Sequence, residues 1–397
     1  MKREQFLNNI WKRYPAMPPR PVAWGRLLEV IDDQLVLESG LKMNMSQDLV
    51  GVLRTGDVIA VTEASPGQQE IHLLAPQIEP VSHISSSPEI QIRFSDYLEG
   101  IRKYFKSQDF IESFTPTLVE CPGTEPFLDY FSTEFTVGKF HKKMYLPTSP
   151  ELHLKKLLAS GYSRIFEIKN CFRNGEAGTH HEPEFMMLEW YRSYSTLEQI
   201  QFDLQSLISA LSGRSVQFHV TTMADQFREK LGFNLTPETT QKEFYTLLRS
   251  KGQIVSEDES LDDLFARLVV DYIEPGLDQN IPTIITHYPP FQAAYARLTV
   301  DGWADRFELF WRGLEIANAF HEVNDPELQL QRMNQDLNKK KTIGKEIPSL
   351  DMEFIQSLRS GVPPAGGIAL GVERLFMGLN HIEDIRDIKV FPMRRFL

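Results

Sequence analysis

The sequence has few of the features that stabilise secreted or membrane proteins. Its 397 residues include only two cysteines, Cys121 and Cys171, and their spacing indicates neither a zinc site nor a disulfide framework. No long apolar run is present, and the basic residues near the start are not followed by a continuous apolar segment. We therefore expect a cytoplasmic protein that does not enter a membrane.

Positive charge is also scarce. The formal net charge is -12, which opposes a protein that binds nucleic acid through a general positive field. Basic residues near the start could form a nucleic-acid-binding tail, although a solvated terminus is the favoured interpretation. These residues are Lys2, Arg3, Lys12, Arg13 and Arg20. The common Gly-rich phosphate loops are absent as well, so nucleotide chemistry would need another design.

Short apolar runs dominate the first part of the chain. They are separated by turn residues, which predicts a small β-barrel. The runs cover residues 22–30, 34–39, 49–54, 57–64 and 70–76. An oligonucleotide-binding barrel is one candidate, but such surfaces need aromatic and basic residues. Residues 21–80 contain Trp24 as their only large aromatic and more acidic than basic residues, which favours a barrel used for packing or for a protein contact.

A segment rich in proline and serine, residues 79–90, separates this region from the rest. We place the boundary near residue 84. The chain is then expected to have a small β-rich, possibly oligonucleotide-binding-like domain at 1–84 and a larger domain at 85–397.

Apolar spacing predicts the elements of the larger domain. A helix starts at Pro88 and is followed by a strand that ends at Thr115 and Pro116, and residues 196–273 are mostly helical with a break near 232–237. Further strands are expected at 129–147, 164–173, 282–288 and 293–299. Strands in hairpin order with helices segregated between them predict an α+β fold with an antiparallel sheet.

One expected strand, residues 184–191, carries an isolated acid. Alternation places Phe185, Met187, Glu189 and Tyr191 on the same face. Both faces of this strand are apolar enough to be buried, so the Glu189 carboxylate needs a cation nearby.

The loop before this strand follows Arg173. A permanently charged guanidinium beside Glu176, His180 and His181 suits a phosphate ligand. An ordinary solvated loop is the alternative. A metal site made by the loop's histidines and acids is less favoured, since adjacent histidines point apart.

A second pair of acids lies in a predicted hairpin. A two-residue turn at 312–313 would pair Phe310 with Glu315 and place Glu308 on the same face. Two carboxylates so placed repel each other unless a cation bridges them, and Mg²⁺ prefers such oxygen ligands together with phosphates. The alternative is an edge hairpin with solvated glutamates.

Four more candidates have weaker signals. Asn318 and Glu322 are expected where this strand gives way to a helix, and Glu151 begins a helix, where it either complements the helix dipole or binds a ligand. A Gly-rich turn within 363–379 precedes a helix that carries Arg374, which suits either the cover of a planar base or a salt bridge.

Taken together and in this order, the segments resemble the three motifs of the class II aminoacyl-tRNA synthetases, and the lysine branch in particular. The helix and strand ending at Pro116 resemble the first motif, residues 172–192 the second, and residues 366–375 the third. The resemblance spans about residues 88 to 394. Within the branch, the chain is most similar to the ligases that attach (R)-β-lysine to elongation factor P.

This resemblance implies ATP and Mg²⁺ as reactants and a two-step adenylation. It implies ATP binding by Arg173, Glu176, His181, Phe185, Glu315 and Arg374, with Arg173 and Arg374 catalytic. It implies a Mg²⁺ site at Glu308 and Glu315. It implies an amino-acid pocket lined by Glu151, Glu189, Tyr191, Asn318, Glu322 and Ala369. A diamine would supply the cation that Glu189 needs.

Three departures bear on the substrates. Gly175 stands where these enzymes carry an acid, so the adenine-reading role moves to Glu176, and Glu373 replaces the usual aspartate of the third motif. Ala369 stands where lysyl-tRNA synthetases have glycine, which favours (R)-β-lysine over α-lysine. The N-terminal domain, by contrast, keeps tRNA open as the acceptor.

The leading hypothesis is therefore a ligase that modifies a lysine of elongation factor P and forms a homodimer, as class II relatives usually do. A lysine–tRNA ligase with a shortened anticodon domain is the alternative. A catalytically silent paralogue is disfavoured because Arg173, Glu308, Glu315 and Arg374 are all present.

Overall fold

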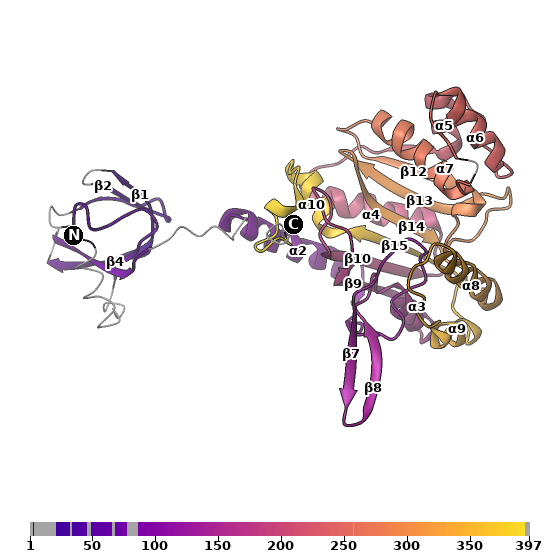
Figure 1. Ribbon diagram of the computed structural model, residues 1–397. Helices are drawn as coiled ribbons and strands as arrows, with labels where there is room; N and C mark the ends of the chain where they lie inside the picture. The colour runs from indigo at the N-terminus through magenta and orange to yellow at the C-terminus, as the bar shows by residue number, and fades with distance from the viewer. Residues whose placement is uncertain are drawn as a thin grey trace. The chain divides into compact units, whose positions relative to one another are not determined.

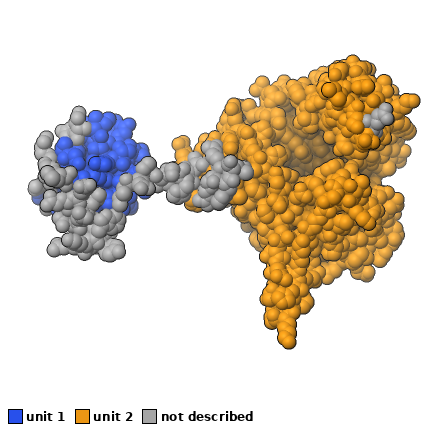
Figure 2. Space-filling model, viewed as in Figure 1, with its two compact units in different colours: residues 1–83 blue, residues 84–397 orange. Residues whose placement is uncertain are grey.

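The computed structural model describes Arg3 and residues 21–31, 34–45, 49–65, 68–77, 86–256 and 258–393. The chain divides into two compact units, residues 1–83 and 84–397 (Figure 2). None of the helices within the described ranges combines the length and the apolar character that a membrane-crossing segment needs. Cys121 and Cys171 are both buried and free.

The first unit is a five-stranded antiparallel sheet in the order β3-β2-β1-β4-β5. Its strands are β1 (Ala23–Ile31), β2 (Gln34–Leu37), β3 (Lys42–Asn44), β4 (Val58–Ser65) and β5 (Gln68–Ala75). Alternate apolar side chains such as Leu27, Leu35 and Ile59 form the buried core. The small β-rich fold predicted for this part of the chain is confirmed.

The strand expected at 49–54 is wrong. This segment forms turns, with Gly51 at a positive φ angle of 76°. Val52 and Leu53 are nevertheless buried. Their apolar character therefore reflects packing under the sheet rather than a strand.

Arg3 is buried in this unit, where it forms an ion pair with Asp57. Its guanidinium donates to both carboxylate oxygens at 2.7 Å. The solvated position that we expected for Arg3 is therefore wrong. The other basic residues of the expected tail lie outside the described residues: Lys2, Lys12, Arg13 and Arg20.

The second unit is built on an eight-stranded sheet in the order β11-β12-β13-β14-β15-β10-β9-β6 (Figure 1). Neighbouring strands are antiparallel except for β11 with β12 and β6 with β9. The strands are β6 (Ile111–Glu112), β9 (Arg164–Phe172), β10 (Glu184–Ser193), β11 (His219–Thr222), β12 (Thr283–Tyr288), β13 (Ala304–Trp311), β14 (Leu314–His321) and β15 (Ala365–Gly371). The predicted α+β class is confirmed.

Helices cover both faces of the sheet. One face packs against α2 (Pro88–Ser107), α4 (Leu197–Ser212) and α10 (Val372–Asn380). The other packs against α3 (Glu151–Ala159), α8 (Pro326–Thr342) and α9 (Met352–Arg359). A third core joins β12 to α5 (Met223–Leu231), α6 (Gln241–Ser250) and α7 (Leu261–Leu268). Short turns of π- or 3₁₀-helix occupy Val269–Ile273, Glu274–Gly276, Pro290–Gln292 and Ile385–Asp387.

Two strand predictions in this unit differ from the structure. The strand expected to end at Thr115 and Pro116 pairs only over Ile111–Glu112. The strand expected at 293–299 is wrong, because the chain leaves a 3₁₀ turn through Ala294 at a positive φ of 47° and makes only isolated bridges. Strand β11, which lies within the segment expected to be mostly helical, was not predicted.

A separate hairpin projects from the second unit (Figure 1). It consists of β7 (Ser132–Val137) and β8 (Phe140–Tyr145), within the expected range 129–147. Phe135, Val137 and Phe140 are exposed near its tip.

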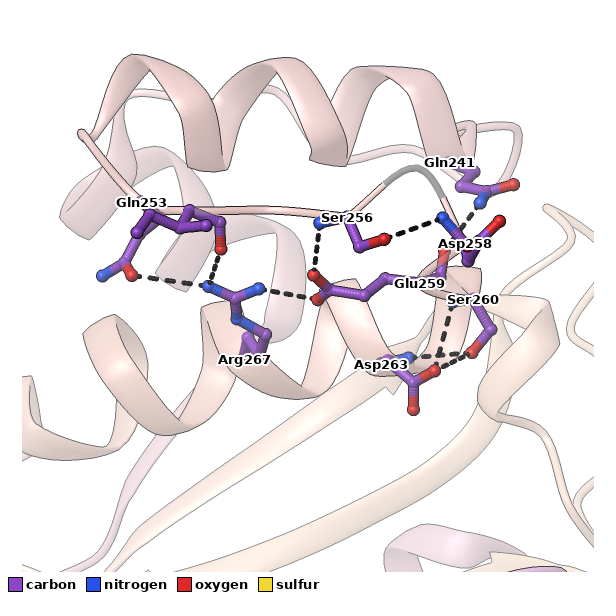
Figure 3. A network of polar contacts seen from close by, with 9 residues as sticks. Gln241, Gln253, Ser256, Asp258, Glu259, Ser260, Asp263 and Arg267 are labelled. Carbon is purple, nitrogen blue, oxygen red and sulfur yellow. Dashed lines mark hydrogen bonds and ion pairs between the residues drawn. The ribbon is translucent and has the colours of Figure 1, made fainter. Parts of the chain in front are cut away.

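The link between α6 and α7 is held by a polar network (Figure 3). Arg267 donates to the Glu259 carboxylate at 2.6 Å and to the Ile254 carbonyl at 3.0 Å. Glu259 also accepts the Ser256 backbone N–H at 2.8 Å. These bonds, with a capping box at the start of α7, order a segment that has little apolar content.

Candidate active site

A cavity of about 290 Å³ lies over the central strands β10, β14 and β15. It brings together residues that are far apart in the sequence. Those among the predicted site residues are Glu151, Arg173, Glu176, His181, Phe185, Glu189, Glu315, Asn318, Ala369 and Arg374. The remaining three predicted residues contact side chains at or next to the cavity. Tyr191 donates to Glu189, Glu308 accepts from Asn318, and Glu322 pairs with Lys155. A larger cavity of about 690 Å³, beside α2 and α4, contains none of the predicted residues.

Sheet register sets one end of the cavity. Ala369 of β15 pairs with Glu189 of β10 on one side and with Asn318 of β14 on the other. The three side chains therefore lie in a row across the floor. The position that we expected for Asn318, at the transition from strand to helix, is wrong, because it lies in the middle of β14.

The glycines of the predicted Gly-rich turn lie within the central strand β15 instead. Gly367 pairs with Tyr191 and Phe320. A Cβ atom at this position would lie 2.3 Å from the Tyr191 ring and 2.2 Å from the Glu322 carboxylate, far inside van der Waals contact. Gly367 thus provides the space that these two side chains occupy.

A β-bulge shapes the opposite end. Phe310 pairs with Glu315 as predicted, but the register then shifts, and Glu308 pairs with Asn318. The extra residue in β14 lets Glu315 and Asn318 both reach the cavity although they are three residues apart. Strict alternation would have placed them on opposite faces.

Glu189 is buried, with 1% of its surface exposed. Its carboxylate accepts hydrogen bonds from the Ser149 hydroxyl at 2.6 Å and from the Tyr191 hydroxyl at 2.9 Å. Burial, followed by the nearby Glu151, raises its pKa to about 8. No ion pair to this carboxylate occurs in the described part of the chain, so the expected cation is not supplied by these side chains.

The sequence interpretation missed Lys155. Its buried ammonium forms ion pairs with Glu151 and with Glu322, the latter at 2.6 Å, and lies 4.3 Å from the centre of the Tyr295 ring. Burial raises the pKa of Glu322 to about 7 despite this ammonium, and Glu151 raises it further. The spacing of four residues between Glu151 and Lys155 on one helix was the signal that could have identified the pair.

Two arginines mark the other end of the cavity. The Arg173 guanidinium lies 5.1 Å from the centre of the Phe185 ring and 3.8 Å from the Glu176 carboxylate. Its Nε is buried and has no hydrogen-bond partner among the described residues. A cationic donor beside an aromatic ring is well suited to a phosphate and a base.

Arg374 is held in place by three hydrogen bonds, the longest of them to the His180 carbonyl at 3.5 Å. It donates to His181 Nε2 at 2.6 Å and to the Glu315 carbonyl at 2.8 Å. Burial and this guanidinium lower the pKa of His181, so the ring accepts the hydrogen bond in its neutral form.

The predicted magnesium ligands differ in their surroundings. Glu308 accepts hydrogen bonds from Arg306, from the Tyr288 hydroxyl at 2.6 Å and from the Asn318 amide at 3.3 Å. Burial raises its pKa to about 7, and Glu315 contributes in the same direction. No group of three or more potential ligands for a metal occurs in the described ranges. Both oxygens of Glu308 are thus engaged by neighbouring side chains, whereas Glu315 lines the cavity. A Mg²⁺ site shared by these two acids stays a prediction.

Residues 84–395 match the family model described as tRNA synthetases class II (D, K and N). The chain belongs to this family. It is an ATP-dependent ligase of the class II synthetase type, and the resemblance seen in the motifs is confirmed.

Several relatives of this class II protein carry the name elongation factor P--(R)-beta-lysine ligase. The Haemophilus ducreyi protein is 35% identical over 320 residues, which cover 78% of this chain and 96% of that protein. The Hamiltonella defensa protein is 31% identical over 313 residues, which cover 77% and 95%. The Haemophilus influenzae protein is 33% identical over 324 residues, which cover 79% and 98%.

The third motif of this class II chain has a further acid with a clear position. Glu373 accepts the Met186 backbone N–H with both oxygens, at 3.0 and 2.9 Å, and the Lys389 ammonium at 2.5 Å. It therefore ties α10 to β10 beside the cavity. Its role was not predicted because neither partner is near it in sequence.

Proposed function

We propose that the protein activates lysine or (R)-β-lysine with ATP as an aminoacyl adenylate and transfers the acyl group to a lysine of elongation factor P in the cytoplasm. The names of the relatives support this acceptor. A lysine–tRNA ligase remains the alternative.

The observation that carries the substrate assignment is the charge at the buried end of the cavity. Three carboxylates, Glu151, Glu189 and Glu322, face one ammonium, Lys155. The pKa values of Glu189 and Glu322 are raised to about 8 and about 7, chiefly by burial, and the neighbouring Glu151 raises both of them further. A diamine would supply the missing positive charge, whereas a neutral side chain would leave the acids unpaired.

The adenylation step would take place at the opposite end of the cavity, beside Arg173 and Arg374. The substrate carboxylate oxygen attacks the α-phosphorus of ATP, the bond to pyrophosphate breaks, and pyrophosphate leaves with that electron pair. Arg173 would contact the α-phosphate and stabilise the charge that develops there. Phe185 and Arg374 would enclose adenine, while Asn318 would donate an amide N–H to the substrate carboxylate.

Glu308 and Glu315 would hold Mg²⁺, which supplies neutralisation of triphosphate charge when bound. Glu176 would read the adenine edge, and His181 would steady Arg374 against it. In the second step the acceptor amine attacks the acyl carbon, AMP leaves, and the amine loses a proton. No nucleophilic protein side chain is needed.

A protein acceptor is favoured over tRNA by the first unit. Between residues 21 and 80 acidic residues outnumber basic ones, and Trp24 is the only large aromatic on which a single-stranded base could stack. A homodimer is part of the proposal, since Ile111 and Phe114 within the first motif are 52% and 84% exposed.

Labelling separates these acceptors. The full chain is incubated with ATP and radiolabelled α-lysine or (R)-β-lysine, together with purified elongation factor P or bulk tRNA. We expect label on elongation factor P that depends on ATP, with Arg173→Ala as the inactive control. Label on tRNA alone would replace the proposal with its alternative.

A further inference from the structure

Glu125 is a cavity acid to which the motifs assign no role. It lies between β6 and β7 and lines the cavity together with Glu151 and Arg173. Its Oε2 atom is buried and has no hydrogen-bond partner in the described part of the chain. A buried carboxylate oxygen without a donor indicates a missing ligand.

The backbone is shaped to hold this carboxylate. Gly123 has a positive φ of 131°, and a Cβ atom there would lie 2.3 Å from Glu125 Oε2. The side chain therefore folds back over a position that only glycine fits. The segment is anchored on both sides, since Tyr130 donates to the Gly123 carbonyl at 3.1 Å and Thr124 to Asp336 at 3.3 Å.

A second unpartnered group faces the same space. Tyr295 lines the cavity, is 6% exposed, and its hydroxyl has no hydrogen-bond partner among the described residues. A carboxylate and a phenol oxygen together form an acceptor pair that suits an ammonium group.

The charged groups around Glu125 favour a cation. Glu151 and Asp336 repel its negative charge and Arg173 attracts it, and burial together with the two acids raises its pKa to about 7. Two buried lysines of this region are already engaged, Lys155 with Glu151 and Lys340 with the Leu128 carbonyl at 2.6 Å.

Glu125 and Glu189 both line the cavity and both lie near Glu151, but they differ in their other charged neighbours. Glu189 lies four residues beyond Phe185 along β10, which corresponds to roughly 13 Å. Phe185 stacks with Arg173 at the nucleotide end, and Glu125 lies within the electrostatic reach of that arginine. Lys155, by contrast, acts on Glu189, so we place Glu125 on the side of the nucleotide end and Glu189 on the side of Lys155.

We propose that Glu125, with the Tyr295 hydroxyl, binds the amino group of the substrate that is nearer to its carboxylate, while Glu189 binds the far amino group. This inference rests on the proposed diamine substrate. It makes Glu125 a specificity-determining residue, because a substrate must have two amino groups at the right separation to pair with both acids.

The test compares substrates that differ by one amino group. (R)-β-lysine and α-lysine contain both amines, whereas 6-aminohexanoic acid contains only the far one. ATP–pyrophosphate exchange gives kcat/KM for the diamines, and inhibition of that exchange gives the binding constant of 6-aminohexanoic acid. The variant is Glu125→Gln, and Glu120→Gln, an exposed acid in the same segment, is the control.

We expect Glu125→Gln to lower kcat/KM for the preferred diamine by about 10- to 150-fold, the effect of one charge-assisted hydrogen bond. Binding of 6-aminohexanoic acid should be unchanged, while Glu189→Gln should weaken both ligands. Glu120→Gln should change neither.

Equal losses for both ligands in Glu125→Gln would show a structural role and overturn the inference, and so would no loss at all. If that variant does not fold, Tyr295→Phe removes only the hydroxyl and should show the same selectivity for the diamine; equal effects on both ligands would again overturn it. A wild-type protein that shows no exchange with either lysine would instead overturn the proposed function.

Discussion

Because the pKa of Glu189 is raised, we predict that binding of the amino acid depends on pH. An ammonium group binds the ionised carboxylate, whereas a group with a pKa of about 8 is mostly protonated at neutral pH. At pH 7 about one molecule in eleven carries the charge, and at pH 8.5 about three in four do. Apparent affinity scales with that fraction, so KM for the diamine should fall roughly eightfold over this range.

Substituting Glu189 isolates this contribution. In Glu189→Gln the fall in KM between pH 7 and pH 8.5 should be smaller, and the part that persists should come from Glu125 and Glu322, whose pKa values are raised to about 7. At pH 8.5 the variant should also bind the diamine about 10- to 150-fold more weakly, because one charge-assisted hydrogen bond is gone. Glu353→Gln, in which the replaced side chain is 90% exposed on α9, is the matched control and should behave as wild type.

The pH dependence of folding stability is an independent measure of the raised pKa of Glu189, and its direction can be predicted. A carboxyl whose pKa is higher in the folded than in the unfolded state contributes stability below its unfolded pKa and loses it as pH rises through the folded value. The ligand-free protein should therefore become less stable towards pH 8, and the rise in Tm caused by the diamine should grow. A wild-type KM that is flat with pH, or an equal pH dependence in Glu189→Gln, would refute the reasoning.

Three further predictions concern other parts of the chain. Glu315→Gln should raise the Mg²⁺ concentration needed for half-maximal exchange and lower turnover, with KM for the amino acid unchanged; a selective rise in that KM would contradict a metal role. Ala369→Gly should raise the use of α-lysine relative to (R)-β-lysine by about 10- to 200-fold in exchange assays, and a wild type that already prefers α-lysine would favour the tRNA ligase. Deleting residues 1–80 should leave exchange largely intact, because every residue lining the cavity lies in the second unit; loss of exchange in a folded truncation would contradict this.

Periodic patterns in the sequence predicted much of the fold and part of the site. Alternation along β10 placed Phe185, Met187 and Glu189 on one face, and all three line the cavity. The hairpin turn likewise gave the pairing of Phe310 with Glu315. Such features depend on neighbours in the chain, which is why sequence reveals them.

The missed features depend on contacts between distant segments. The bulge in β14 depends on how β13 and β15 pack around it, so no local pattern marks it. Residues 49–54 and 293–299 are apolar because they pack in a core, and a short apolar run does not reveal whether its backbone is extended. Glu125 becomes a candidate ligand-binding residue only because its segment folds over the cavity, which the sequence does not show.

The bulge in β14 has a consequence for how the site tolerates change. Before it, Glu315 faces the cavity; after it, Asn318 and Phe320 do. The ends of the cavity proposed for Mg²⁺ and for the amino acid therefore depend on residues of opposite parity on one strand. If one residue between Glu315 and Asn318 were deleted, the side chains on one side of the deletion would point into the core instead of the cavity, while those on the other side would keep their direction. Point substitutions can adjust either end separately, whereas a change of length in this hairpin would break the site as a whole.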